Sequence, residues 1–266
     1  MATQSIVLTA TDAAWAWSTI APQTVLTAQA IGGGGGGGGE TGDPAAAGGG
    51  MGGGYATIEI TKGAETTLNI VVGIAGTAGA GGNGGAGAAS SITQVSTVVL
   101  RAPGGGGGAG ATTANHSGAG GTVANGVPYG SATKAGGVGG NGVYTTATSG
   151  GGGGAAGPTA DGGAASGATA GAHGGGNFLN GVDYCSLGAA GRVTTENDGI
   201  TGPGVGAGGS GGNAPDNTNH PGGAGYRGVV VLTWTLPNLS VAMSECGPED
   251  LAVSMTEVVG SDVRFG

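Results

Sequence analysis

The stretch Gly73-Ile-Ala-Gly76-Thr-Ala-Gly79-Ala-Gly-Gly82-Asn-Gly-Gly85 places glycine at every third position for five consecutive triplets. The spacing returns at Gly136, Gly139 and Gly142, and at Gly222, Gly225 and Gly228. A helix with three residues per turn, the polyproline II geometry, puts every third residue on one edge, where a glycine lets a neighbouring backbone approach. The period therefore predicts that one chain folds back repeatedly into a bundle of short polyglycine II helices.

Two other kinds of structure are also rich in glycine: flexible linkers and collagen. Glycine is 71 of 266 residues, and low-complexity sequence of this kind is often a flexible linker. However, only 8% of the residues are charged, whereas disordered segments are usually rich in charge. Collagen needs an unbroken Gly-X-Y period with abundant proline, and here the register resets and ten prolines are present. An ordered bundle is therefore favoured.

Runs rich in β-branched residues bracket the glycine tracts and predict strands. They are residues 5–10, 24–31, 55–60, 67–72, 97–101 and 228–235. The predicted fold class is all-β/irregular, with a small antiparallel sheet that anchors the bundle. We divide the chain into N-terminal strands with the first glycine tracts (1–103), the bundle with exposed loops (104–227), a closing strand (228–235) and an acidic repeat hairpin tail (236–266). The three tryptophans, Trp15, Trp17 and Trp234, are assigned to packing.

The tail contains a second repeat, in which Leu, Val, Met and Glu recur in order twelve residues apart. Apolar residues alternate with small polar ones, which is typical of a half-buried strand, and residues 246–250 supply a turn. A hairpin with one apolar face needs a cover, either the main body or another protein, and we favour a partner or a second copy. The candidate assembly contacts are Leu239, Val241, Met243, Leu251, Val253 and Met255.

Charge and cysteine content exclude several functions. A net charge of −9 with six Lys and Arg argues against binding nucleic acid or anionic lipid. No signal peptide is visible, and the uncharged residues 66–100 are too polar for a membrane span. Cys185 and Cys246 form no spaced framework, so we expect free thiols and synthesis in a reducing cytoplasm.

No motif predicts a catalytic site, a cofactor or a metal. Matches to glycine-rich phosphate loops occur by chance in such a sequence, and none leads into a helix or a Lys-Ser/Thr pair. His116, His173 and His220 lack neighbouring ligands at metal spacing. The carboxylates, Glu40 among them, are dispersed, and we assign them to surface solvation. We therefore expect no enzyme.

Segments that interrupt the glycine triplets predict loops between the helices. They contain residues 112–117, 123–129, 177–185 and 213–220, and they hold Asn, Asp, Pro and aromatic residues. Aromatic residues on short rigid loops are effective binding contacts, although they can equally cap the ends of the bundle. The candidate receptor contacts are His116, Tyr129, Tyr144, Phe178, Tyr184 and His220.

An ordered succession of motifs carries a family resemblance. Polyglycine after the second predicted strand, Gly-Gly-Gly-Tyr55-Ala-Thr-Ile, Leu68-Asn-Ile-Val-Val-Gly73, Val99-Leu-Arg-Ala-Pro-Gly and Gly225-Tyr-Arg-Gly-Val-Val-Val-Leu-Thr-Trp234 follow one another over residues 5–235. This pattern resembles the glycine-rich domain of bacteriophage tail-fibre and receptor-binding proteins, and its architecture is similar to that of the long-tail-fibre adhesins of T-even-type phages. The resemblance implies packed polyglycine II helices with loops displayed for host attachment. The tail after Trp234 departs from it.

The leading hypothesis is thus a non-enzymatic phage structural protein, a tail-fibre adhesin or receptor-binding protein on the exterior of the virion. Its partners would be other virion proteins and a bacterial surface receptor, and it would be oligomeric in the particle. The alternative is a capsid decoration or tail collar protein without receptor binding. An ice-binding protein ranks below both because threonine forms no regular array in the sequence, and an enzyme ranks last.

Overall fold

The computed structural model describes residues 3–17, 20, 24–41, 44–193, 197–214 and 218–235. The chain divides into two compact units, Met1–Leu236 and Pro237–Gly266, and the second lies wholly outside the described residues. The predicted tail hairpin with its candidate assembly contacts therefore also lies outside them. The first unit is all-β with irregular segments, which confirms the predicted fold class.

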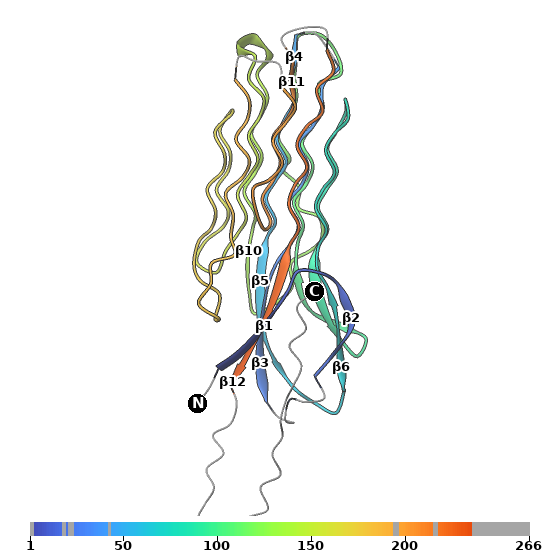
Figure 1. Ribbon diagram of the computed structural model, residues 1–266, viewed down its shortest axis with the longest axis vertical. Coiled ribbons are helices and arrows are strands. Elements are labelled where there is room, and N and C mark those ends of the chain that lie inside the picture. The colour runs from blue at the N-terminus through green and yellow to red at the C-terminus, as the bar shows by residue number, and fades with distance from the viewer. Residues whose placement is uncertain are drawn as a thin grey trace, which may run out of the picture. The chain divides into compact units, whose positions relative to one another are not determined.

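Two antiparallel sheets hold the long strands (Figure 1). The first has the order β1-β12-β3-β5-β10 and contains β1 (Thr3–Leu8), β3 (Val25–Ile31), β5 (Tyr55–Thr61), β10 (Ala132–Lys134) and β12 (Val229–Thr235). The second has the order β2-β6-β7-β8 and contains β2 (Asp12–Ala16), β6 (Thr67–Val71), β7 (Ser90–Gln94) and β8 (Thr97–Ala102). The six predicted strands are present, but they divide between two sheets instead of forming one, because β2 and β7 pair with β6.

The two sheets share one hydrophobic core. Leu26, Ile60 and Leu232 come from the first sheet, and Leu68, Ile70, Ile92 and Leu100 come from the second. Trp17 is fully buried there, and its indole N–H donates to the carbonyl of Glu65 at 3.0 Å. Trp15 and Trp234 are partly buried and pack against the same core. The tryptophans therefore lie in the core, as predicted.

Beyond the sheets the chain runs as extended segments that form a hexagonal lattice. The N–H groups of residues 32–39 donate in rotation to segments 48–54, 82–88 and 220–226, as in Gly35 to Met51, Gly36 to Gly85 and Gly37 to Gly223. The carbonyls of residues 33–39 accept in rotation from segments 105–111, 73–79 and 206–212. Segment 32–39 thus has six hydrogen-bonded neighbours, and its backbone groups are satisfied between segments, as three residues per turn requires.

Three further segments have six hydrogen-bonded neighbours each. They are 48–54, 150–156 and 206–212, and bonds such as Gly50 to Gly209 and Gly153 to Gly50 join them to one another. Segments such as 73–79 and 135–142 lie at the edge of the lattice. The observed bundle thus draws on glycine tracts from both sides of residue 103, and segment 32–39 is one of its four interior segments.

The position of a segment in this lattice explains its glycine pattern. A methyl carbon placed on any of residues 32–39 would lie between 1.9 and 2.2 Å from a backbone oxygen of a neighbouring segment. An interior segment meets neighbours on all sides and needs glycine nearly throughout, whereas an edge segment needs it where it faces the interior. The edge segment 73–79 accordingly keeps glycine at every third position.

The lattice separates two ends of the first unit (Figure 1). The long sheets lie at one end, which we call the sheet end. At the other lies a small sheet of order β11-β4-β9, made of β11 (Asn213–Ala214), β4 (Ala45–Ala46) and β9 (His116–Ser117), together with the 3-10 turn η1 (Tyr144–Thr146). We call the described residues among 40–46, 111–118, 143–149, 192–198 and 213–220 the loop end.

Candidate functional site

The structure divides the six candidate receptor contacts between the two ends. His116 on β9, Tyr144 on η1 and His220 lie at the loop end. Tyr129 lies at the sheet end, where its backbone forms a bridge with Arg101 of β8. Phe178 and Tyr184 also lie near the sheet end, in a cluster with residues of β3, β5 and β12. No one surface therefore contains all six.

Glu40 is a buried residue of the loop end that is hydrogen-bonded to another loop. Its side chain is 0% exposed, so the prediction that this carboxylate is solvated at the surface is wrong. Oε1 of Glu40 accepts the N–H of His220 at 2.8 Å, and the N–H of Glu40 donates to the carbonyl of His220 at 3.0 Å. The next residue, Thr41, donates to Ala111 at 3.1 Å. Three segments distant in sequence are thereby joined, and no sequence motif signals this.

Side chains cross-link the remaining loops of this end. Nδ2 of Asn213 donates to the carbonyl of Ala147 at 2.8 Å, which joins β11 to the residue after η1. Oγ of Ser117 accepts the N–H of Tyr144 at 3.2 Å, which joins β9 to η1. β4 pairs with β9 in parallel and with β11 in antiparallel fashion. The loops are thus held in place before any ligand arrives, which lowers the entropy lost on binding.

His220 is held between two side chains. Nδ1 lies 3.0 Å from Oδ1 of Asp198, and Nε2 lies 2.9 Å from Oγ1 of Thr218. In space, the hydroxyl of Thr218, the imidazole of His220 and the carboxylate of Asp198 thus follow one another as a nucleophile, a base and an orienting carboxylate do in a catalytic triad. Asp198 is 66% exposed, however, so water screens the carboxylate that would have to orient the imidazole. We interpret this chain of contacts as a tie between residues 198 and 218–220.

The exposed surface of the loop end is polar and mostly uncharged. Its exposed hydroxyl, amide and imidazole groups come from Thr41, Thr112, Thr113, Asn115, His116, Ser117, Thr145, Thr146, Thr218 and Asn219. Tyr144 is half-buried beside them, and Val143 and Val193 are the large exposed apolar residues. Such a surface can recognise a ligand through neutral hydrogen bonds and one aromatic ring.

Tyr129 stands on a different kind of surface. It is 55% exposed, and Val123 and Val127 of the same loop are each 75% exposed. The loop is fastened to the second sheet, since the N–H of Arg101 donates to the carbonyl of Tyr129 at 2.8 Å and the reverse bond is 3.0 Å long. Tyr129 is therefore accessible but lies at the end opposite to His116 and Tyr144.

Phe178 is a core residue. It is 1% exposed, and its ring lies edge-on to Tyr55 and Tyr184, with centroids 5.6 and 5.1 Å away. The N–H of the next residue, Leu179, donates to Oε1 of Gln29 at 2.7 Å, and Nε2 of Gln29 donates to the hydroxyl of Tyr55 at 2.7 Å. Burial raises the pKa of the Tyr55 hydroxyl. Residues 177–184 thus cover one face of the first sheet, and the ring of Phe178 does not face solvent.

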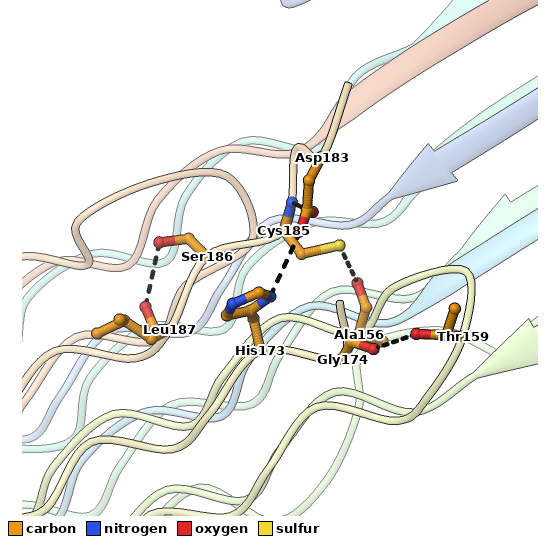
Figure 2. A network of polar contacts seen from close by, with 8 residues as sticks. All are labelled: Ala156, Thr159, His173, Gly174, Asp183, Cys185, Ser186 and Leu187. Carbon is orange, nitrogen blue, oxygen red and sulfur yellow. Dashed lines mark hydrogen bonds and ion pairs between the residues drawn. The ribbon is translucent and has the colours of Figure 1, made fainter. Parts of the chain in front are cut away.

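Figure 2 shows the polar network beside this aromatic cluster. Asp183 accepts the N–H of Cys185 through Oδ1 at 2.8 Å, and its Oδ2 lies 3.8 Å from Nδ1 of His173. The thiol of Cys185 donates to the carbonyl of Ala156 at 3.5 Å. Burial, reinforced by Asp183, raises the pKa of the Cys185 thiol to about 12. A thiol that stays protonated is a poor nucleophile, which argues against a catalytic role for Cys185, His173 and Asp183. Their contacts instead connect the segments around residues 156, 173 and 183–185.

Two properties of the described residues bear on other functions. Among them, no group of three His, Cys, Asp or Glu side chains is arranged to hold a metal ion. The same part of the chain contains no helix long and apolar enough to cross a membrane. Cys185 is a free thiol, as predicted, whereas Cys246 lies outside the described residues.

Fold and site together define an all-β protein in which a polyglycine II lattice carries cross-linked loops at one end. A family model described as a glycine-rich domain matches residues 9–235, which covers both sheets and the whole lattice. The chain belongs to this family. A comparison with curated proteins found no match.

Proposed function

We propose that this chain is a non-enzymatic structural protein of a phage virion, a tail-fibre or receptor-binding protein that contacts a bacterial surface structure through its loop end. The observation that carries the proposal is the gathering of cross-linked loops at one end of a lattice whose long sheets lie at the other end. The resemblance to phage tail-fibre domains described above supports it, and so does membership of the glycine-rich domain family.

The polarity of the first unit suits attachment at one end and recognition at the other. β1 and β12 are paired so that Thr3 lies opposite Thr235 at the sheet end. A rigid spacer between the two ends holds the loops clear of the particle, and rigid loops bind at a small cost in entropy.

Within the loop end, we assign recognition to His116 and Tyr144. They stand on adjacent elements that the bond from Tyr144 to Ser117 holds together. His220 positions the loop instead, since both of its ring nitrogens and its N–H have partners. Phe178 is left out of the contact surface because it is buried.

Adsorption of phage particles tests the proposal. Particles that carry His116→Ala with Tyr144→Ala should assemble normally but adsorb to host cells at least about tenfold more slowly. The matched control is Tyr129→Ala, which removes an exposed tyrosine at the opposite end and should leave adsorption unchanged. Normal adsorption of the double variant, with the chain located by electron microscopy on the capsid or the tail collar, would favour the purely structural role.

A further inference from the structure

One strand edge differs from all the others in the described part of this protein. A strand at the edge of a sheet presents unpaired N–H and C=O groups, and proteins usually protect such edges with charge, proline, bulges or short length. β1 is the outermost strand beside β12, and its residues make no backbone hydrogen bond to any other described segment. The edge of β1 is thus available for pairing.

The other edges all carry such protection. β10 is three residues long and ends in Lys134, and the part of β5 beyond it contains Glu59. β2 begins with Asp12 and shifts register before Trp15. β8 is covered in part by the backbone bridge between Arg101 and Tyr129. Two-residue strands form the edges of the small sheet at the loop end.

β1 has none of these devices. Its six residues, Thr-Gln-Ser-Ile-Val-Leu, include no charged residue and no proline. It pairs with β12 in unbroken register from Thr3 to Leu8. Ser5 is exposed, and Val7 keeps 39% of its surface exposed even though it is apolar.

We propose that β1 is an interface at which a second copy of this chain pairs edge to edge. Antiparallel pairing of β1 with β1 about a twofold axis would join the two five-stranded sheets into one. A second copy is the occupant because an antiparallel strand edge is self-complementary: each copy offers the unpaired N–H and C=O groups that the other needs, and the strand itself carries no charge. Two chains of net charge −9 repel each other, and an uncharged strand lets them meet without a like-charge pair at the contact.

The pairing goes beyond the proposed receptor role and does not depend on it. The dimer would lie at the sheet end and leave His116 and Tyr144 exposed at the loop end. Failure of the pairing would therefore leave the adsorption experiment unaffected, and failure of adsorption would leave the pairing unaffected.

Sedimentation of the purified full chain tests the proposal. The wild-type chain should sediment as a dimer, and Ser5→Lys should raise the dimer dissociation constant by about tenfold or more, because it would place two lysines close to the twofold axis on the same face of the joined sheet. Ser5→Glu should act in the same way, and an equimolar mixture of the two variants should recover dimers that contain both. The matched control is Thr235→Lys, an exposed position on the same sheet but on the inner strand β12, which should leave the dimer unchanged.

Either of two results would overturn the proposal. One is a wild-type chain that stays monomeric at every concentration measured. The other is a dimer that Ser5→Lys and Ser5→Glu leave intact while both variants melt at the wild-type temperature. Should Ser5→Lys fail to fold, Val7→Lys provides the same test at the next residue that faces that side.

Discussion

Replacement of Gly35 by alanine should destabilise the lattice far more than the same change at its edge. The methyl carbon of Gly35→Ala would lie 2.0 Å from the carbonyl oxygen of Gly106. A carbon and a carbonyl oxygen pack no closer than about 3.3 Å, so segments 32–39 and 105–111 would have to separate by about 1.3 Å. The hydrogen bonds from Gly105 to Gly33 and from Gly108 to Gly36, now 2.8 and 2.9 Å long, would then break.

The magnitude follows from the groups left without partners. Each broken bond strands a buried donor and acceptor at a cost of about 1–3 kcal/mol, or roughly 2–6 kcal/mol for the two. The lower entropy of the unfolded chain offsets about 0.4–1 kcal/mol of this. We therefore expect Gly35→Ala to lower the free energy of unfolding by about 1–5.5 kcal/mol.

Gly82→Ala is the matched control. A methyl group there meets nothing within 4 Å, and the backbone conformation is an ordinary one. The substitution should therefore stabilise the protein by about 0.4–1 kcal/mol through the unfolded chain. Urea unfolding of the two variants beside the wild type measures the difference. Equal stability of Gly35→Ala and Gly82→Ala would refute the argument that close backbone contact decides where glycine is required.

Three other substitutions or modifications test separate parts of the structure. Gly167→Ala should cost about 1–2 kcal/mol in urea unfolding although no atom lies near, because φ is +53° there, and a neutral effect would contradict the assigned turn. Phe178→Ala should cost about 3–5 kcal/mol, and a loss below about 1 kcal/mol would show that residues 177–184 do not cover the sheet. In a Cys246→Ser background, iodoacetamide should label Cys185 much more slowly in the folded than in the unfolded protein. Burial raises the pKa of the Cys185 thiol from 9.0 to about 12 in the folded protein, so the thiol of the unfolded chain ionises first. The contribution of this thiol to stability should therefore be complete below pH 9 and be lost as the pH rises towards 12. Fast labelling of the folded protein would contradict the raised pKa of Cys185.

Periodicity predicted much of the fold. The triplets in 73–85 indicate a three-residue turn, and the β-branched runs indicate the six strands that the structure contains. Why glycine is continuous over 32–39 but periodic over 73–79 could not be predicted, because the reason is the number of neighbouring segments, which depends on the fold. β7 was missed because Ser-Ser-Ile-Thr-Gln is too polar to indicate a strand, although Ile92 is buried in the core.

The candidate site was less accessible to sequence reasoning. Aromatic and histidine residues between glycine triplets correctly indicated positions outside the regular lattice, but nothing in their local sequence distinguishes the loop end from the sheet end. Phe178 and Tyr144 look alike as interruptions, yet the former is buried against β3 and β5 residues and the latter lies at the loop end. Glu40 follows a glycine run, and no motif around it indicates burial. It is buried because the chain near Ala111 and His220, far away in sequence, packs beside it.

Amide hydrogen exchange across residues 73–79 tests the polyglycine II lattice most directly. In the described structure the N–H groups of Gly73, Gly76 and Gly79 donate to Ser90, Gly34 and Gly37, and the N–H groups between them have no partner among the described residues. The lattice therefore predicts slow exchange at every third residue and fast exchange at Ile74, Ala75, Thr77 and Ala78, with slow exchange throughout 32–39. Alternate protection with a period of two, or uniformly fast exchange over both segments, would contradict it.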